Sequence, residues 1–440
     1  MCHPGTSGLE SAPRGPIPPA VQREGGIRDE TGRRLEGLTP AEVAASLRHL
    51  PGLVFFDTAG NLPASYGAPV SVVAARPREI FEGSIHSAED RALLERALER
   101  GASRTAPDRG FPLGGLCGWL DYEGRFVFGD FPEMLVYDHR RGAWHEKGLL
   151  STELRPSAAA QVSIGAFSPL MERETFLAGV RRIREWIAAG DIYQVNLTQG
   201  FVAPLQGGDL FGLYELLREC SPAPLAAYLS LAGKEILSSS PETFLRMSGR
   251  GIETRPIKGT RPRHADPDED RRSAYELQTS PKEIAELVMI TDLLRNDLGQ
   301  VSEFGSVHVA EMLQLETLGQ VHHLVSTVTG TLREGTSHLT ALAACFPGGS
   351  ITGAPKKRAM EIIRELEKTP RGIYCGAIGY LGYHGESQFS IAIRTLVRDG
   401  DSLSYHVGAG IVADSDPLKE YEETLHKAAG IRMAVERFGR

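Results

Sequence analysis

The sequence predicts a mixed α+β fold built on large antiparallel sheets, and three observations support this prediction. Between Gly114 and Gly142, short apolar runs alternate with turns, as expected of antiparallel strands. Two further strand-like runs, within residues 375–397, are joined around the His384–Glu386 turn. Helical and strand-like segments follow one another irregularly to the end, and no repeat period emerges.

The composition is that of an ordinary globular protein and excludes several classes of function. The chain has 440 residues, of which 41% are hydrophobic and 24% are charged, enough for a large core and a buried active site. Its formal net charge of -8, without a long Lys/Arg block, argues against a nucleic-acid partner. The first residues contain no apolar stretch behind a basic start, and no apolar run approaches the ~20 residues of a membrane span, so we expect neither export nor membrane insertion. The five cysteines lack CxxC spacing, so we expect no disulfide framework and a cytoplasmic location.

Four stretches of different composition organise the chain. Residues 1–38 are rich in Gly, Pro, Arg and Glu, and we expect a disordered tail. Residues 39–153 open with a capped short helix and continue as a β-rich region. The small and polar residues 154–169 form a connector, and 170–440 form the main region, predicted to carry the active site.

The main region begins with a predicted helix followed by a strand. The helix has Phe176, Val180, Ile183 and Ile187 in helical register. The segment DIYQVNLTQGFVA then reads as the strand.

Two later helix starts carry paired glutamates. In TSPKEIAELVMI, Ser280 can act as N-cap, and Glu283 is placed to complete a capping box. Glu286 lies one turn further on the same face and lacks such a structural explanation. Carboxylates in a first helical turn often only complement the helix dipole, so one pair alone would be weak evidence for a site.

The second helix start strengthens the case. In DSDPLKEYEETL, Asp416 and Pro417 open a helix on which Glu420 and Glu423 share a face at the same spacing. If the two helices converge, four mutually repelling carboxylates require a cation between them. Oxygen ligands suit a hard ion such as Mg²⁺, which leaves coordination places for water and an anionic substrate.

Other motifs favour a structural role or remain open. The glycine-rich FPGGSITGAPKKR fails the Walker spacing, and HVGAGIVADSDP fails as a dinucleotide fingerprint, although both can present backbone N–H groups to a carboxylate. Cys117 has Trp119 where a glutaminase elbow needs glycine, so we predict a core cysteine. His322 and His323 alternate along a strand, so at most one faces a shared pocket.

Lys258 in RPIKGTRPR lies where a strand runs into a turn. A lone lysine is usually a solvated surface charge. The segment nevertheless belongs to an ordered series of motifs: SSSPETFLRM, RPIKGT, ELVMITDLLRNDLG, FPGGSITGAPKKRAMEII, YCGAIGY, FSIAIRTL and GAGIVADSDPLKEYEETLHKA. Together they resemble the chorismate-utilising enzymes, which include component I of anthranilate synthase and of aminodeoxychorismate synthase. The resemblance is strong over residues 165–435 and loose over 40–150.

The resemblance implies two large packed antiparallel sheets flanked by helices, as in anthranilate synthase component I. It also implies Mg²⁺ holding the ring carboxylate of chorismate. Glu286 and Glu423 match the metal ligands, and Glu420 and Glu283 lie beside them, through water or as acid/base groups. His323 matches the active-site histidine. The candidate substrate-binding residues are Tyr374, Arg394, Gly408, Gly410, Thr352 and Lys427.

Two positions distinguish the members of the family. Anthranilate synthases usually carry alanine where this chain has Lys258, whereas relatives with PIKGT are thought to use the lysine as a nucleophile on chorismate. Glu242 matches their general acid/base carboxylate. Relatives that add water carry a lysine at the position of Gln194, so the resemblance favours ammonia as the incoming group.

The expected function is therefore the Mg²⁺-dependent amination of chorismate to 4-amino-4-deoxychorismate, on the way to 4-aminobenzoate and folate. No plausible glutaminase triad occurs in this chain. The resemblance thus implies ammonia from a separate glutamine amidotransferase subunit. Two alternatives remain open: component I of anthranilate synthase, and a non-catalytic chorismate-binding protein.

Overall fold

The structure, a computed structural model, describes residues 35–58, 69–102, 110–156 and 161–439. Within these ranges the α-helices are α2 (Pro40–Leu47), α3 (Ala88–Gly101), α4 (Arg173–Ala188), α5 (Phe211–Cys220), α6 (Pro267–Thr279), α7 (Pro281–Gly299), α8 (His338–Cys345), α9 (Lys356–Leu366), α10 (Pro417–Lys427) and α11 (Ala429–Phe438). Two 3₁₀ helices are η2 (Leu150–Glu153) and η3 (Gly349–Ile351). No described helix has the length and apolar character needed to cross a membrane.

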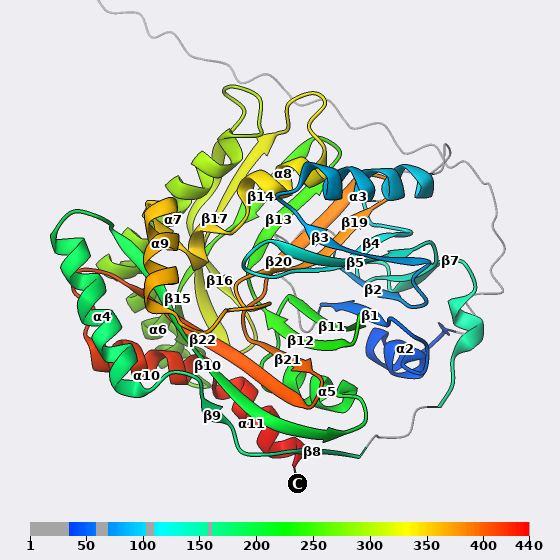
Figure 1. Cartoon of the computed structure of the whole chain (residues 1–440), viewed down its shortest axis with the longest axis horizontal. Coiled ribbons are helices and arrows are strands. Elements are labelled where there is room, and N and C mark those ends of the chain that lie inside the picture. Colours follow the sequence, from blue (N-terminus) through cyan, green and yellow to red (C-terminus); the bar gives the residue numbers. More distant parts are fainter. Residues whose placement is uncertain (1–34, 59–68, 103–109, 157–160, 440) are drawn as a thin grey trace, which may run out of the picture.

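The described strands form two large sheets, and every strand pair within them is antiparallel (Figure 1). The 12-stranded sheet runs in the order β18 (Gly353–Ala354), β10 (Gln194–Gly207), β22 (Ser402–Ile411), β21 (Thr395–Asp399), β12 (Lys234–Ser240), β11 (Leu225–Leu231), β1 (Val54–Asp57), β2 (Val70–Ala74), β6 (Met134–Asp138) and β7 (Ala143–Lys147), with β8 (Val162–Ile164) and β9 (Ser168–Pro169) paired to β10. The 10-stranded sheet runs in the order β15 (Ile257–Pro262), β17 (Val321–Thr331), β14 (Gly251–Arg255), β13 (Thr243–Ser248), β20 (Glu386–Ile391), β19 (Ala377–Gly382), β4 (Gly115–Leu120), β5 (Arg125–Phe131) and β3 (Glu79–Ser84), with β16 (His308–Thr317) paired to β17. The predicted fold class is confirmed.

Apolar side chains fill the space between the two sheets. Val54 and Val72 of the 12-stranded sheet belong to the same buried cluster as Trp119 and Ile378 of the 10-stranded sheet. Each strand alternates its side chains between two faces, so the opposite faces of both sheets need further cover. Helices provide that cover.

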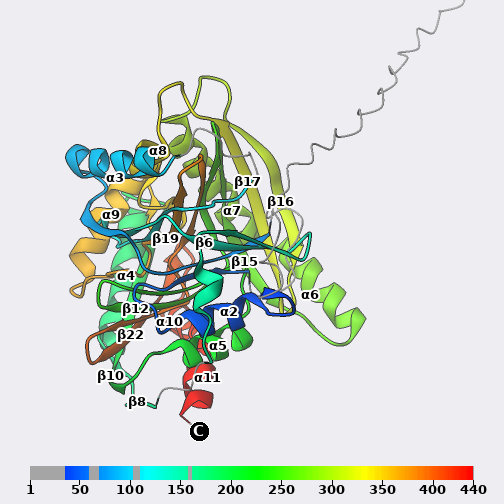
Figure 2. The same cartoon turned by 90° about the vertical axis from the view of Figure 1, so that its right-hand side faces the viewer.

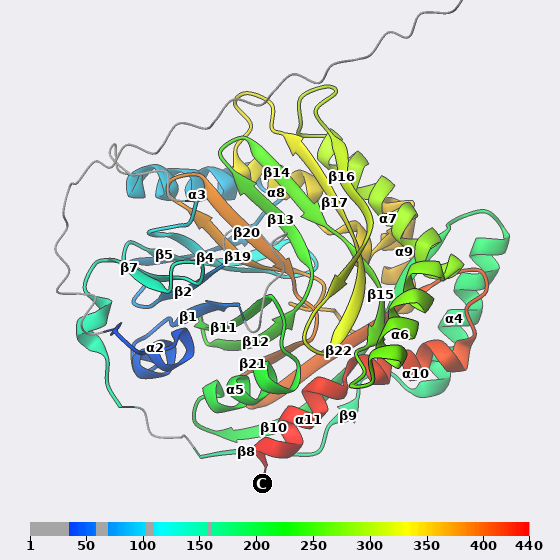
Figure 3. The same cartoon turned by 180° about the vertical axis from the view of Figure 1, so that it is seen from behind.

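On the outer face of the 12-stranded sheet lie α2, α5 and α11, which Figure 3 shows along the lower edge of the molecule. Thr39 caps α2 with a complete capping box, as the sequence predicted for a capped helix. The 10-stranded sheet is covered by α3 and α8, with Leu94 and Leu342 in one cluster with Phe128.

Helix α4 packs against β10 and α9 through the predicted periodic face. Phe176, Val180 and Ile183 are buried there with Ile362, and Ile187 lies partly buried at the margin. Figure 1 shows α4, α7, α9 and α10 grouped at one end of the molecule. This end holds the predicted site residues.

The four predicted stretches differ from the observed layout at their borders. The β-rich region 39–153 contributes β1, β2, β6 and β7 to the 12-stranded sheet and β3, β4 and β5 to the other, so it shares both sheets with the main region. The connector 154–169 ends in β8 and β9, which extend the edge of β10. Most of the predicted tail, residues 1–34, lies outside the described residues.

The last part of the predicted tail is packed into the protein. Leu35 is 0% exposed and belongs to the cluster under α2, α5 and α11. We expect Leu35→Ala to lower the free energy of unfolding by about 2–4 kcal/mol, because it removes buried methyl groups and leaves a cavity. Urea unfolding followed by circular dichroism measures this. Leu149→Ala is the matched control, because Leu149 is 65% exposed; equal effects of the two substitutions would contradict the burial of Leu35.

Candidate active site

Lys258 lies at a bulge in β15. The pairing of β15 with β17 shifts register between Lys258 and Thr260, and Gly259 between them has φ +71°. Bulges of this kind re-aim side chains and are common beside active sites. The Lys258 ammonium donates to the carbonyl oxygen of Ser350, at 3.4 Å, so it points toward η3 and away from bulk solvent.

The two predicted glutamate helices converge beside Lys258. Ser280 caps α7 and Asp416 caps α10, as the sequence predicted. The Lys282 amine of α7 lies 3.6 Å from the Glu420 carboxylate of α10, which joins the two helix starts. Figure 2 shows α7 next to the long strands β16 and β17.

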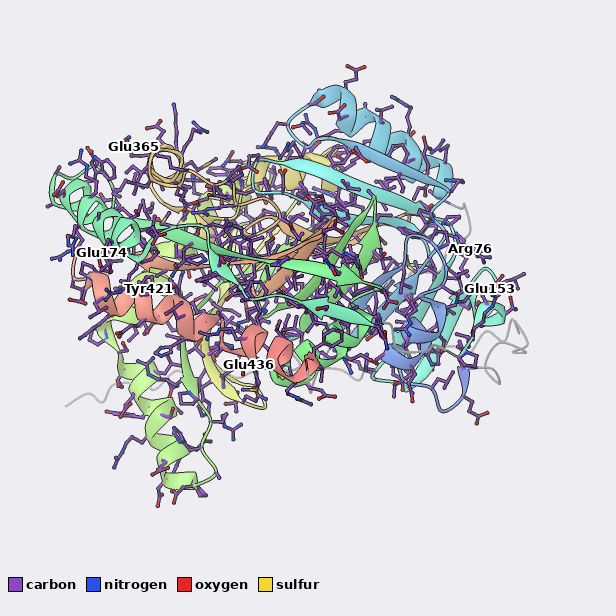
Figure 4. The ribbon with its side chains drawn as sticks, turned by 60° about the horizontal axis from the view of Figure 1, so that its bottom comes forward. Arg76, Glu153, Glu174, Glu365, Tyr421 and Glu436 are labelled. Atoms are coloured by element: carbon purple, nitrogen blue, oxygen red, sulfur yellow. The ribbon has the colours of Figure 1, made fainter. Side chains whose placement is uncertain are left out.

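Packing against α4 fixes the position of α10. The Phe176 ring meets the Tyr421 ring edge-on at 5.7 Å, and the Arg173 guanidinium lies 5.7 Å from the Tyr421 ring centre. Figure 4 labels Tyr421 on α10 and Glu174 on α4. The cap and this aromatic contact together aim Glu420 and Glu423 toward α7.

Three of the four carboxylates have partners of their own. Glu420 is buried and accepts a hydrogen bond from the Ser415 hydroxyl at 2.6 Å. Glu423 pairs with Lys427 at 2.8 Å. Glu283 lies 3.7 Å from Arg261. These three side chains therefore differ in their surroundings.

Glu283 departs from the predicted capping box. Its backbone N–H donates to the Ser280 hydroxyl at 3.4 Å, which is one half of that motif. The carboxylate instead lies against Gly259, where a Cβ would come 3.1 Å from it. Glu283 therefore faces the Lys258 bulge, and this part of the sequence interpretation is corrected.

Burial raises the pKa of Glu286 above its ordinary value; Lys258 and Lys282 oppose that shift, while Glu283 and Glu423 add to it. Glu423 has a lowered pKa, since Lys427, Lys282 and Lys258 together outweigh its burial. The charge of Lys258 thus affects the pKa of both carboxylates, and Glu423 also affects the pKa of Glu286. The two side chains offer only oxygen atoms as metal ligands. A divalent cation between them would reduce the repulsion between their negative charges. These residues therefore fit Mg²⁺ chemically. Among the described residues, no group of three or more His, Cys, Asp or Glu side chains is already assembled for a metal.

Glu242 lies between β12 and β13, near enough to Lys258 for the two charges to interact. Burial raises the pKa of Glu242, against the opposing effects of Lys258, a hydrogen bond from Ser350, the Ile257 backbone N–H and Arg394. A raised pKa keeps more of the carboxyl in its acid form. Such a group can give a proton to a leaving oxygen nearby.

Arg394 faces Glu242 from a strained backbone position. Its φ is +50°, a left-handed value that a non-glycine residue adopts at a cost. Burial lowers the pKa of Arg394, and Glu242 partly offsets this effect. Within the described residues its guanidinium has no hydrogen-bond partner, which suits recognition of an anion.

His323 and His322 point to opposite sides of β17, as predicted. Burial, with a smaller effect of Arg394, lowers the pKa of His323 to about 4, so its ring is neutral near pH 7. The His323 Nδ1 lies 3.1 Å from the Thr260 hydroxyl, while its buried Nε2 lacks a partner in the described part of the chain. The His322 Nε2 instead lies 3.0 Å from Asp270. Only His323 faces the Lys258 bulge.

The predicted glycines lie on β22, against β10. A Cβ on Gly410 would come 2.2 Å from the amide nitrogen of Gln194, so only glycine leaves room for that side chain. Gln194 is buried, and its Oε1 has no hydrogen-bond partner among the described residues. Lys427 donates to the Gly408 carbonyl at 3.1 Å and also pairs with Glu423, so it connects this strand to the carboxylates.

Two predicted substrate-binding residues have other neighbours. The Tyr374 ring stacks on His406, with centroids 5.6 Å apart and an interplanar angle of 23°. The buried Thr352 hydroxyl donates to the carbonyl oxygen of Gly348 at 3.0 Å. The Thr352 hydroxyl thus stabilises its own loop. Its proton is used in that hydrogen bond, so toward a ligand the hydroxyl can act only as an acceptor.

Sequence reasoning overlooked Lys282 and Ser350. Lys282 stands in the first turn of α7, where the helix dipole disfavours a cation, and that mismatch was a signal in the sequence. Ser350 gave no signal, because its contacts with Lys258 and Glu242 join segments that lie far apart in the chain.

Two motifs are structural, and for Cys117 this was predicted. In DLLRNDLG, Leu294 and Leu298 are buried, and Asp297 pairs with Lys356 of α9 at 2.6 Å. Cys117 is buried in the core between the sheets, where burial raises the pKa of its thiol. Neither motif contributes a side chain to the candidate site around Lys258.

The family follows from comparison with known proteins. The model of the chorismate binding enzyme family matches residues 133–433, which is more than half of the chain. The chain therefore belongs to the chorismate binding enzymes. It is 38% identical over 399 residues to anthranilate synthase component 1 of Methanothermobacter thermautotrophicus, covering 84% of this chain and 85% of that protein. It is 45% identical over 327 residues to aminodeoxychorismate synthase component 1 of Klebsiella aerogenes, covering 73% of this chain and 70% of that protein.

Solved structures of chorismate binding enzymes share the fold. Anthranilate synthase component I of Streptococcus pneumoniae aligns with a TM-score of 0.72 at 27% identity, over 85% of this chain and 94% of that chain. The isochorismate synthase MenF of Escherichia coli aligns with a TM-score of 0.73 at 17% identity, over 91% and 92% of the two chains, which shows the fold alone. The predicted resemblance is confirmed at the level of family and fold.

Proposed function

We propose that this chorismate binding enzyme aminates chorismate to 4-amino-4-deoxychorismate, with Lys258 as the nucleophile. The observation that carries the proposal is the position of the Lys258 amine. It donates to the Ser350 carbonyl, and its charge acts on Glu242, Glu286 and Glu423. A lysine used only for solubility would not be aimed by a bulge into a group of carboxylates.

The proposed chemistry proceeds in two displacements. In its unprotonated form the Lys258 amine forms a bond to C2 of chorismate, both ring double bonds shift toward C4, and the C4 hydroxyl leaves as water with a proton from Glu242. Ammonia then bonds to C4, both double bonds shift back, and the C2–N bond to Lys258 breaks. The added nitrogen returns a proton to Glu242, which restores the enzyme.

The other site residues bind and orient the substrate. Arg394 and the backbone N–H groups of Gly408 and Gly410 are suited to its carboxylates. Tyr374 adds a hydroxyl, and neutral His323 offers a hydrogen bond without adding charge. A bound Mg²⁺, held by Glu286 and Glu423 with Glu420 and Glu283 beside them, would hold the ring carboxylate and polarise the ring.

We infer that ammonia is the incoming group and comes from a separate glutamine amidotransferase subunit in the cytoplasm. Gln194 cannot act as the base that water would require. The relatives named above are each called component 1, which supports a two-component system. Release of pyruvate would then fall to another enzyme.

Anthranilate synthesis is the second candidate, because the relative from Methanothermobacter thermautotrophicus covers more of this chain than the Klebsiella aerogenes relative does. A fluorescence assay separates the two. The purified chain is incubated with chorismate, Mg²⁺ and an ammonium salt, with and without aminodeoxychorismate lyase. We expect 4-aminobenzoate only when the lyase is present. Anthranilate formed without the lyase would overturn the proposal, and chorismate binding without turnover would indicate a non-catalytic protein.

A further inference from the structure

A buried ion pair between Arg371 and Glu367 lies beside the candidate site. Glu367 is the C-cap of α9, and the two side chains are 1% and 5% exposed. The Arg371 Nε donates to Glu367 Oε2 at 2.8 Å, and its Nη2 donates to Glu367 Oε1 at 2.7 Å, so the pair is bidentate. The guanidinium also lies over the ring of Tyr122, 4.5 Å from the ring centre.

The ion pair takes the place of a strand along one edge of β10. On that edge β18 pairs with residues 194–195 and β9 with residues 201–202, and the part of the chain that the structure describes places no strand between them. The Asn196 carbonyl instead accepts from the arginine Nη2 at 2.7 Å, and the Thr198 N–H donates to the glutamate at 3.0 Å. The pair thus supplies the donor and the acceptor that a neighbouring strand would supply.

The same arginine holds the loop that contacts Lys258. The Arg371 Nη1 donates to the Ile351 carbonyl at 2.9 Å. Ile351 follows Ser350 in η3. The Ser350 carbonyl accepts from Lys258, and the Ser350 side chain forms a hydrogen bond with Glu242. Arg371 is therefore separated by one hydrogen bond and one peptide unit from a residue that contacts both proposed reacting groups.

The shape of the guanidinium matters more here than its charge. A buried ion pair adds little net stability, because the loss of hydration offsets the attraction between the two charges. The planar fork of Arg371, however, donates in fixed directions to the carboxylate, to β10 and to η3 at the same time. A lysine would keep the charge but could not donate to all three partners in these directions.

We propose that Arg371 is a positioning residue that fixes η3 against β10 and thereby places Ser350 for its contacts with Lys258 and Glu242. This inference rests on the proposed function, which gives Lys258 and Glu242 their roles in the reaction. Because Arg371 acts through Ser350, its replacement should slow the reaction and leave substrate binding largely intact.

The test compares Arg371→Lys with wild type in the full chain. We expect kcat for chorismate consumption to fall on the order of tenfold to a hundredfold, because small misplacements of reacting groups have effects of this size. Calorimetry with chorismate and Mg²⁺, without ammonia, should give a Kd within about threefold of wild type. Arg437→Lys is the matched control, since Arg437 pairs with Glu219 at 2.9 Å on the surface, and it should match wild type in both measurements.

The pH profile separates positioning from a general structural role. The hydrogen bond with Ser350 lowers the pKa of Glu242, as do the charges of Lys258 and Arg394, which both remain in the variant. If η3 shifts in Arg371→Lys, the pKa of Glu242 rises. The fall of kcat/KM with increasing pH should then occur at higher pH than in wild type. A substitution that only reduces the folded fraction would leave the profile in place.

If Arg371→Lys does not fold, Glu367→Gln takes its place, because it keeps an oxygen that can accept from Arg371 and removes the charge. A folded variant with the kcat and pH profile of wild type overturns the inference. A parallel loss of kcat and chorismate affinity also overturns it, because Arg371 would then shape the substrate site as a whole. Anthranilate formed by wild type without the lyase refutes the proposed function, while chorismate consumption still decides the role of Arg371.

Discussion

Lys258→Ala should lose roughly a thousandfold in turnover, about 4 kcal/mol of activation free energy, while binding chorismate within about threefold of wild type. The substitution removes the proposed nucleophile but leaves Arg394, the glycines of β22 and the glutamate pair, which are proposed to hold the substrate. Turnover is measured through the lyase-coupled formation of 4-aminobenzoate, and binding by calorimetry in the presence of Mg²⁺.

Two further variants separate nucleophilic from electrostatic roles of Lys258. Lys258→Arg keeps the positive charge among the carboxylates but has no nucleophilic amine, so it should be as inactive as Lys258→Ala. Lys368→Ala, at an exposed lysine on the surface, is the control and should retain wild-type turnover. Substantial activity in Lys258→Arg would reduce Lys258 to a countercharge and refute the covalent route.

Glu242→Gln should lower turnover by roughly 10²- to 10⁴-fold, because it removes the acid that protonates the departing hydroxyl. The raised pKa of Glu242 also predicts a pH dependence with a definite sign. Only the protonated form donates, so kcat/KM of wild type should fall as pH rises through that pKa. Glu242→Gln should lack this descending limb, since its amide does not titrate.

Glu365→Gln provides the control for the second prediction. Glu365 is exposed on α9, as labelled in Figure 4, and its substitution should preserve both the rate and the pH profile. A descending limb that persists in Glu242→Gln would assign the proton transfer to another group.

Local sequence patterns determined the pieces of this fold. The N-caps at Thr39, Ser280 and Asp416 were readable because a side-chain oxygen satisfies backbone N–H groups within the same few residues. The opposite orientations of His322 and His323 follow from strand geometry alone. Patterns of this kind depend on neighbours along the chain.

Local patterns predict neither the burial of Leu35 nor the contact of Glu283 with Gly259. Leu35 stands in a polar, glycine-rich stretch, yet it is buried by α2, α5 and α11, the last of which is nearly 400 positions away. The Glu283 carboxylate lies against Gly259 in the bulge and does not complete the local capping box. In both cases a contact with a distant segment outweighs the local pattern.

The sequence by itself determined the family motifs, the two glutamate pairs and the types of atom available to a metal or substrate. Only the tertiary structure decided that Lys258 contacts the Ser350 carbonyl and acts on three carboxylates, and that Lys282 of α7 pairs with Glu420 of α10. The reason is that local hydrogen bonds and side-chain periodicity fix each element, whereas the direction of a bulged strand and the meeting of two helix ends depend on how separate elements pack. The strength of a charge interaction depends on the distance between the two groups. For groups on different elements, that distance is known only from the packed structure.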